Sequence, residues 1–156
     1  MNRSLERQPV AFLFDLDGTL VDSVYQHVLA WREAMQGAGI ELAVWRIHRQ
    51  IGMSGGLMLS AFLREIGRVL SAEEVERIQR THAEAYRRQA DSLRVLPGAL
   101  ELLAELSARG VPYAIATSGR SQSAQPTLEL LNLPPDVPVV TRDDVRHAKP
   151  DPDLFV

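Results

Sequence analysis

The chain has 156 residues, of which 46% are hydrophobic and 24% charged, as in an ordinary folded domain rather than a disordered or membrane-embedded segment. Its formal charge of −3 gives no basic surface for nucleic acid or an anionic membrane. The absence of cysteine excludes disulfides and thiolate metal sites. Since the apolar run that follows Arg3 and Arg7 is too short for a signal peptide, we expect a cytoplasmic protein that binds neither nucleic acid nor membranes.

Strand and helix patterns follow one another along the chain. Residues 10–14 form a continuous apolar run with β-branched and aromatic members, which predicts a buried parallel strand. The loop Asp15-Leu-Asp-Gly-Thr19 comes next. Apolar residues at helical spacing then predict a helix from Ser23 to Gly37 and a wholly helical stretch that continues to about Arg94.

The alternation of strands and helices resumes after this stretch. Pro97 at a first helical position and Gly110 beyond the last turn predict a helix between them. The further expected elements are a strand at 111–116, a helix at 122–131, a strand at 137–141 and a helix from Asp153. We therefore predict an α/β fold: a doubly wound parallel sheet with a core of residues 1–20 and 95–156, and an all-helical cap inserted at 21–94.

Three polar clusters follow the predicted strands: Asp15 with Asp17, Thr117-Ser-Gly119, and Lys149. Since the carboxyl ends of parallel strands share one edge, where ligands bind, we expect the clusters to converge. Two neighbouring carboxylates cannot both ionise easily, so one pKa should rise unless a cation intervenes. That division would provide an ionised nucleophile, able to form an aspartyl-phosphate, and a proton donor. Hard oxygen ligands beside a phosphate indicate Mg²⁺.

Each cluster alone also fits a plain structural role. Asp, Gly and Thr are common in strand-to-helix turns, and a lone lysine is usual on a surface. An EF-hand is excluded, because Gly18 is the fourth residue of a loop that follows a strand rather than a helix. Lys149 is more specific, because it is the one lysine among 17 Lys and Arg residues. Pro150 and Pro152 are expected to hold the chain extended around it, and a compact ammonium fits between carboxylate and phosphate better than arginine's planar fork.

The stretches Asp15-Leu-Asp-Gly-Thr-Leu-Val-Asp-Ser23, Thr117-Ser-Gly119 and Lys149-Pro-Asp-Pro152 resemble the first three motifs of the haloacid dehalogenase-like hydrolase superfamily. Within it, the chain is similar to the phosphoglycolate phosphatase and β-phosphoglucomutase group, which inserts a helical cap after the first motif. The resemblance covers nearly the whole chain.

The resemblance implies a role for each motif residue. Asp15 would be the nucleophile and a Mg²⁺ ligand, and Asp17 the general acid/base that binds Mg²⁺ through its backbone carbonyl. The Thr117 hydroxyl would bind the phosphoryl group, and Lys149 would neutralise charge between that group and Asp15. Dehalogenases of the superfamily lack the second acid, so Asp17 favours phosphoryl chemistry. Further substrate contacts are expected from Gly18, Thr19, Ser118, Gly119 and Arg120.

The family's fourth motif, an acidic pair that completes the Mg²⁺ site, would lie beyond Val156. Two further strands of the core are expected there too. We therefore expect that these 156 residues alone are inactive, bind Mg²⁺ weakly and expose the edge of the first strand to association.

Residues of the predicted cap are candidates for substrate recognition. His48, Arg49 and the glycine-rich loop at 52–56 lie where similar proteins bring the cap over the site, and an arginine suits a carboxylate or second phosphate. A solvated helix face for Arg49 and a plain turn for the glycines remain open. Packing is predicted for Tyr25, His27 and Trp31, and surface positions for His82 and His147.

The predicted function is a Mg²⁺-dependent phosphatase that hydrolyses a small phosphorylated metabolite through an aspartyl-phosphate, as phosphoglycolate phosphatases do. Two alternatives remain: a phosphomutase of the β-phosphoglucomutase type, and a non-catalytic unit that acts only in interactions. The sequence leaves the substrate and the oligomeric state open.

Overall fold

The computed structural model describes residues 10–156, so residues 1–9, with Arg3, Arg7 and the start of the predicted core, lie outside the described part. A three-stranded sheet has the order β1-β4-β5, and both of its pairings are parallel. Its strands are β1 (Phe12–Phe14), β4 (Tyr113–Ala116) and β5 (Val139–Val140). The predicted α/β class with a parallel sheet is confirmed.

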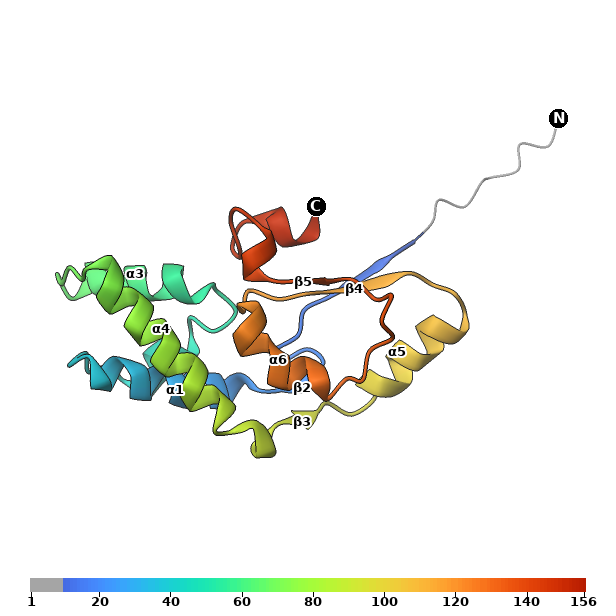
Figure 1. Cartoon of the computed structure of the whole chain (residues 1–156), viewed down its shortest axis with the longest axis horizontal. Helices are drawn as coiled ribbons and strands as arrows, with labels where there is room; N and C mark the ends of the chain where they lie inside the picture. The colour runs from blue at the N-terminus through green and yellow to red at the C-terminus, as the bar shows by residue number, and fades with distance from the viewer. Residues whose placement is uncertain (1–9) are drawn as a thin grey trace.

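The two faces of the sheet are covered differently. Helices α5 (Ala99–Ala108) and α6 (Ser121–Glu129) lie below the strands in Figure 1. Leu106 of α5 and Ala124 of α6 belong to the same buried cluster as Ile115 of β4. On the other face, Leu154 of the 3₁₀ helix η3 (Pro152–Phe155) packs in a small cluster with Ala116. The helix expected from Asp153 is therefore a short 3₁₀ helix.

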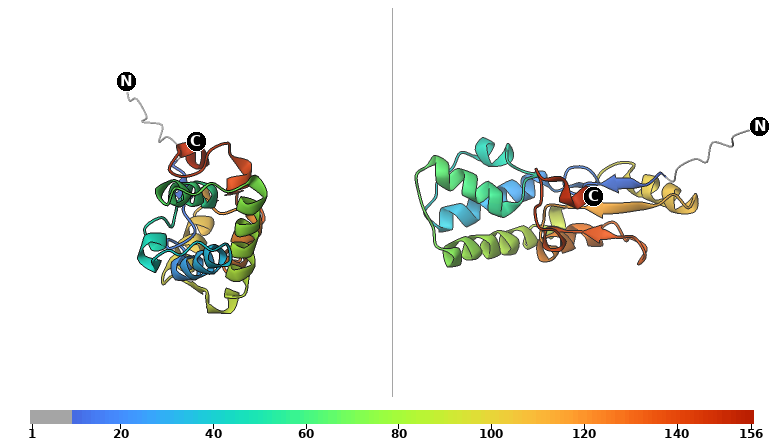
Figure 2. Two further views of the ribbon diagram at one scale, coloured as in Figure 1. Left: turned by 90° about the vertical axis from the view of Figure 1, so that its left-hand side faces the viewer. Right: turned by 90° about the horizontal axis from the view of Figure 1, so that it is seen from above.

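Four helices pack beside one end of the sheet, as the view from above in Figure 2 shows. They are α1 (Val24–Gly37), α2 (Val44–His48), α3 (Gly55–Glu65) and α4 (Ala72–Arg87). Their facing apolar residues form a second cluster, which includes Trp31, Met35, Ile47, Phe62 and Ile78. None of the helices in residues 10–156 is long and apolar enough to cross a membrane.

Local signals explain where two of these helices begin. The Ser71 hydroxyl accepts a hydrogen bond from the Glu74 amide at 3.2 Å, and the Glu74 carboxylate accepts from the Ser71 amide at 2.8 Å. These two bonds form a capping box at the start of α4, as the sequence Ser71-Ala-Glu-Glu74 indicates. Helix α3 begins at Gly55, where an added β-carbon would stand 2.5 Å from the Trp31 ring. A glycine is needed there because α1 and α3 approach closely through that ring.

A pair of very short strands joins the two parts of the fold. Strand β2 (Val21–Asp22) pairs antiparallel with β3 (Arg94–Val95), with Val21 opposite Val95. The sequence pattern does not indicate them, because two residues are too few to show a periodicity. The chain passes from the sheet to the four helices through β2 and returns to the sheet region through β3, so the pairing holds these two passages side by side. The 3₁₀ helix η1 (Ala90–Ser92) precedes β3.

Two expectations about the sheet region are wrong. Pro97 is not a helical residue: α5 begins at Ala99, after Gly98 with φ of 84°, a left-handed value that ends any continuous helix from Pro97. Strand β1 is not buried, since Phe12 and Leu13 are 42% and 48% exposed. It is an edge strand in the described part of the chain, with β4 as its one paired neighbour.

Candidate active site

The three polar clusters meet at the carboxyl edge of the sheet. Asp15 follows β1 and Thr117 follows β4, and because Phe14 lies opposite Ile115 in a parallel pairing, both leave the sheet at the same end. Lys149 comes from the segment after β5, and its Nζ lies 2.6 Å from Oδ1 of Asp15. Tertiary folding thus places an ammonium against the first carboxylate.

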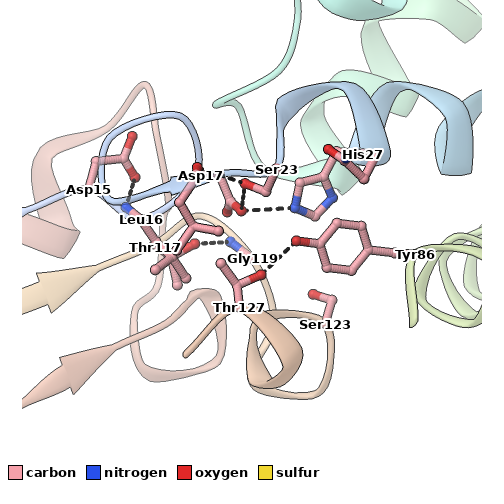
Figure 3. Close-up of polar contacts among 12 residues, drawn as sticks. Asp15, Leu16, Asp17, Ser23, His27, Tyr86, Thr117, Gly119, Ser123 and Thr127 are labelled. Carbon is pink, nitrogen blue, oxygen red and sulfur yellow. Dashed lines mark hydrogen bonds and ion pairs between the residues drawn. The ribbon is translucent and has the colours of Figure 1, made fainter. Parts of the chain in front are cut away.

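The Asp15 carboxylate is held from two directions. Its Oδ1 accepts a hydrogen bond from the Leu16 amide at 2.9 Å and also faces Lys149 (Figure 3 draws the first contact). The two charged side chains are 36% and 19% exposed, so the pair orients the carboxylate more than it stabilises the fold. Within residues 10–156, Oδ2 has no hydrogen-bond partner, which leaves that oxygen available to a ligand.

The loop after Asp15 turns tightly around one carbonyl group. The Leu16 carbonyl accepts hydrogen bonds from the amides of Thr19, Leu20 and Val21 at 3.0 to 3.3 Å. Gly18 has φ of 76°, and an added β-carbon would stand 2.8 Å from the Val24 side chain. Gly18 and Thr19 therefore shape the turn but do not line the cavity described below.

Asp17 points toward α1 rather than toward Lys149. Its Oδ1 accepts hydrogen bonds from the Ser23 hydroxyl at 2.6 Å and from Nε2 of His27 at 3.1 Å (Figure 3). Burial alone would raise the pKa of Asp17, but His27, the hydrogen bonds from His27 and Ser23, and Lys149 together hold that pKa below its usual 3.8. The expected rise from carboxylate crowding does not occur, and the pKa of Asp17 is lowered instead.

A second histidine continues the contact made by His27. Nδ1 of His27 lies 3.2 Å from Nε2 of His82 on α4, and the His27 ring stacks on Tyr86 with centroids 3.8 Å apart. Since a carboxylate only accepts, Nε2 of His27 carries a proton, and Nδ1 of a neutral His27 accepts from Nε2–H of His82. Burial, with His27 adding to it, lowers the pKa of His82 well below 6.5, so His82 is neutral near pH 7.

The prediction of a surface position for His82 is therefore wrong. Its side chain lies on the buried stripe of α4, one turn beyond Ile78 and one turn before Tyr86. That spacing is the signal in the sequence that could have placed it. His147 is 58% exposed, as predicted, whereas Tyr25 is 62% exposed and packs on the His48 ring rather than against the core.

The segment after β4 presents hydroxyl groups to the same region. Thr117 is buried, and its hydroxyl oxygen accepts from the Gly119 amide at 3.0 Å (Figure 3). The Ser118 hydroxyl is buried and has no hydrogen-bond partner in residues 10–156. Arg120 turns away from the aspartates and lies 3.4 Å from Glu76 of α4. Thr117 is thus fixed by its own turn, and Ser118 keeps an unused donor.

These groups open into a cavity of about 610 Å³ between the sheet edge and the helices. On the sheet side it is lined by Asp15, Asp17, Thr117, Ser118, Gly119 and Arg120, and also by Arg142 and Asp143, which were not predicted. On the helical side it is lined by the loop 51–57 and by one face of α4. This glycine-rich loop also touches the segment after β5, since the Ser54 amide lies 3.4 Å from the Lys149 carbonyl oxygen.

Two predicted features of the site differ in the structure. Arg49 does not line the cavity; its guanidinium lies 6.0 Å from the centre of the Trp45 ring. The segment around Lys149 is not extended: the Lys149–Pro150 peptide is cis, and the Asp151 amide hydrogen-bonds to the Ala148 carbonyl at 3.2 Å. A turn, rather than an extended segment, therefore directs Lys149 toward Asp15.

The residues at the sheet edge fit Mg²⁺ in part. Asp15 and the Asp17 backbone carbonyl are hard oxygen donors, and Mg²⁺ in proteins commonly binds one or two carboxylates together with a substrate phosphate and water. No group of three or more His, Asp or Glu side chains in residues 10–156 could hold a metal ion by itself. The Asp17 carboxylate is engaged with Ser23 and His27, so this part of the chain offers a partial ligand set.

Comparisons with known proteins agree with this geometry. Hexitol phosphatase A of Escherichia coli is 35% identical over 147 residues, which cover 93% of this chain and 65% of that protein. Phosphoglycolate phosphatase of Rhodospirillum rubrum is 33% identical over 151 residues, covering 92% of this chain and 63% of that protein. The chain thus spans a little less than two thirds of these relatives.

A solved structure and a family profile extend the likeness. The crystal structure of a hydrolase from Pseudomonas syringae superposes with a TM-score of 0.89 at 52% identity, covering 93% of this chain and 67% of that one. The sequence profile of the haloacid dehalogenase-like hydrolases matches residues 10–156. The chain therefore belongs to the haloacid dehalogenase-like hydrolase family.

Proposed function

We propose that the protein is a Mg²⁺-dependent phosphatase that hydrolyses a small phosphorylated metabolite through an aspartyl-phosphate on Asp15. One observation carries the proposal: a carboxylate with one free oxygen, paired at 2.6 Å with the chain's one lysine, at a sheet edge that opens into a cavity. The names of the two relatives support a small phosphate ester as substrate.

The proposed reaction has two steps. An Asp15 oxygen attacks phosphorus, a phosphorus–oxygen bond forms, and the ester bond breaks as the leaving oxygen takes a proton from Asp17. Water then attacks the aspartyl-phosphate, Asp17 accepts the water's proton, and inorganic phosphate and free Asp15 are released. Lys149 offsets the negative charge between Asp15 and the phosphoryl group, and the Thr117 hydroxyl and the Ser118 hydroxyl bind its oxygens.

The environment of Asp17 sets the order of events in this scheme. Its pKa is lowered in the free site, so near pH 7 it is ionised before substrate binds. A phosphate dianion placed beside it raises that pKa by like-charge repulsion. We propose that Asp17 takes up its proton with the substrate, and that His27, which already donates to its Oδ1, keeps the carboxyl group in place.

Bound Mg²⁺ would screen the phosphate and help to orient it against Asp15. The donors in this chain would be the Asp15 carboxylate and the Asp17 backbone carbonyl.

We further propose that residues 21–94 form a cap over a core of residues 1–20 and 95–156. The separate apolar cluster of the four helices supports this division, as do strands β2 and β3 at its borders. The border is not sharp, since Ala30 of α1 and Ala85 of α4 pack in the cluster of the sheet.

The test is an assay of the whole protein against a panel of phosphorylated metabolites, with Mg²⁺ and with EDTA. We expect phosphate release that requires Mg²⁺, and a phosphorylated peptide containing Asp15 by mass spectrometry after rapid quenching. Formation of a phosphate isomer without release of phosphate would identify a phosphomutase instead. No turnover and no phosphoenzyme with any substrate would leave the non-catalytic alternative.

A further inference from the structure

Helix α4 forms the wall of the cavity that faces the sheet edge. Glu76, Gln79, Arg80 and His82 are polar residues of this wall. Asp15 and the loop after β4 lie on the opposite wall. A ligand whose phosphate reaches Asp15 therefore extends its other end toward α4.

Gln79 has an unused hydrogen-bonding atom on this wall. Its side-chain oxygen is buried and has no hydrogen-bond partner in residues 10–156, as is also true of the Ser118 hydroxyl on the facing wall. A buried polar atom without a partner costs about 1–3 kcal/mol, so such atoms are expected to be satisfied by water or a ligand. Both residues line the cavity, Ser118 on the wall that carries Asp15 and Gln79 on α4. Their two unpaired atoms could therefore bind opposite ends of one ligand.

Gly56 lies next to the Gln79 amide. A β-carbon at Gly56 would stand 3.5 Å from the amide nitrogen, which is an ordinary contact distance. Gly56 and Gln79 both line the cavity. The glycine therefore adds no side chain between the Gln79 amide and the cavity.

The chemistry of this wall favours a neutral, hydroxyl-bearing group. A glutamine amide both accepts and donates, which matches a hydroxyl group and carries no charge to offset a carboxylate. The nearest acid on the wall, Glu76, is paired with Arg120 from the other side of the cavity. Arg80 is the remaining cation of this face, and its side chain is exposed.

We propose that Gln79 determines specificity by hydrogen-bonding a hydroxyl group of the leaving alcohol, and that the substrates are phosphate esters of polyols or sugars. This inference rests on the proposed phosphatase function.

The test compares three substrates of the whole protein: sorbitol phosphate, phosphoglycolate, and p-nitrophenyl phosphate, whose alcohol bears no hydroxyl group. For Gln79→Leu, kcat/KM for sorbitol phosphate should fall by about tenfold, the value of one hydrogen bond, while the p-nitrophenyl phosphate value changes by less than about twofold. Gln79→Asn keeps the amide but shortens its reach. It should also lower kcat/KM for sorbitol phosphate relative to that for p-nitrophenyl phosphate. Melting temperatures establish that both variants fold.

A matched control is Gln125→Leu, because Gln125 is exposed on α6 and bonds Glu129 away from the cavity. This variant should leave kcat/KM unchanged for all three substrates. Equal losses on all substrates, no loss on sorbitol phosphate, or a clear wild-type preference for phosphoglycolate would overturn the inference. Wild-type protein that releases phosphate from none of the three, and from no member of the metabolite panel, would instead refute the proposed function itself.

Discussion

The two walls of the cavity are built on different principles. On the sheet wall, Asp15 directly follows strand β1, and Nζ of Lys149, from the turn beyond β5, lies 2.6 Å from its Oδ1. The helical wall carries neutral polar groups such as His82 and Gln79 on the faces of helices, together with Glu76, which pairs with Arg120, and the cation Arg80. The charged groups proposed to react are thus held beside the sheet, whereas the groups that would contact the rest of a substrate come from the helices.

The same contrast separates the two aspartates, although only Leu16 lies between them. Asp15 faces the cavity with one free oxygen, whereas Asp17 is 17% exposed and held by Ser23 and His27 of the helical side. Both carboxylates therefore line the cavity from the same loop, but only that of Asp17 is hydrogen-bonded to the helical side. Substitutions on the two walls should consequently affect different properties, the rate of reaction on the sheet wall and stability or substrate preference on the helical wall.

The largest effect is expected for Asp15→Asn. An amide cannot attack phosphorus, so kcat should fall by at least about 10⁴-fold while the melting temperature stays close to that of the wild type. Steady-state kinetics and thermal unfolding check both parts. Asp136→Asn, an exposed loop position, is the matched control and should retain full activity. Activity within about tenfold of wild type for Asp15→Asn would remove this residue from the nucleophile role.

Asp17→Asn should have the next largest effect. Loss of the general acid/base should slow kcat by about 10²–10⁴-fold, with both phosphorylation and hydrolysis of the phosphoenzyme affected. Rapid-quench measurements with p-nitrophenyl phosphate separate the steps, because its good leaving group depends less on a proton. If Asp17→Asn slows the reaction of p-nitrophenyl phosphate as much as that of an alkyl phosphate ester, Asp17 acts by shaping the loop rather than by transferring a proton.

Lys149→Ala should lower kcat/KM by about 10²–10³-fold, the usual loss when one charge-stabilising donor is removed. Lys149→Arg should not rescue it, because a planar guanidinium does not fit the place of an ammonium that contacts a single carboxylate oxygen. Near-wild-type rates for the arginine variant would show that any cation serves at this position.

The smallest effect is expected for a substitution that changes helix packing rather than a reacting group. Gly55→Ala should destabilise the fold by about 1–3 kcal/mol, because its β-carbon would collide with the Trp31 ring at 2.5 Å. Gly37→Ala is the matched control: it is helical, has no atom within 4 Å of the added carbon, and should stabilise α1 by up to about 1 kcal/mol. Urea denaturation measures both. Equal stabilities would mean that the Trp31 ring moves freely.

Most of the sheet wall could be predicted from the sequence, because its signals are local. The strand before Asp15, the strand before Thr117 and the capping box at Ser71 each depend on residues within a few positions of one another. Parallel pairing then brings the ends of β1 and β4 to one edge, so the convergence of Asp15 and Thr117 follows from topology, whereas Lys149 also needs the turn after β5.

The helical wall could not be predicted in the same way. His82 was expected on the surface and Arg49 in the site, yet His82 is buried against His27, and Arg49 lies over Trp45 outside the cavity. Both outcomes depend on the angles at which α1, α2 and α4 pack, which no short stretch of sequence specifies. The open edge of β1 agrees with the expectation for these residues, but the apolar run alone does not indicate that Phe12 and Leu13 are about half exposed.

The sequence by itself determined which residues end the strands and hence which groups can react, because backbone periodicity and turn chemistry act over a few residues. Only the tertiary structure decided that Asp17 turns to His27, that His27 meets His82, and that Gln79 faces the cavity. Those contacts join residues that lie on separate helices, or on a helix and a loop, and the packing of side chains between these elements sets their distances.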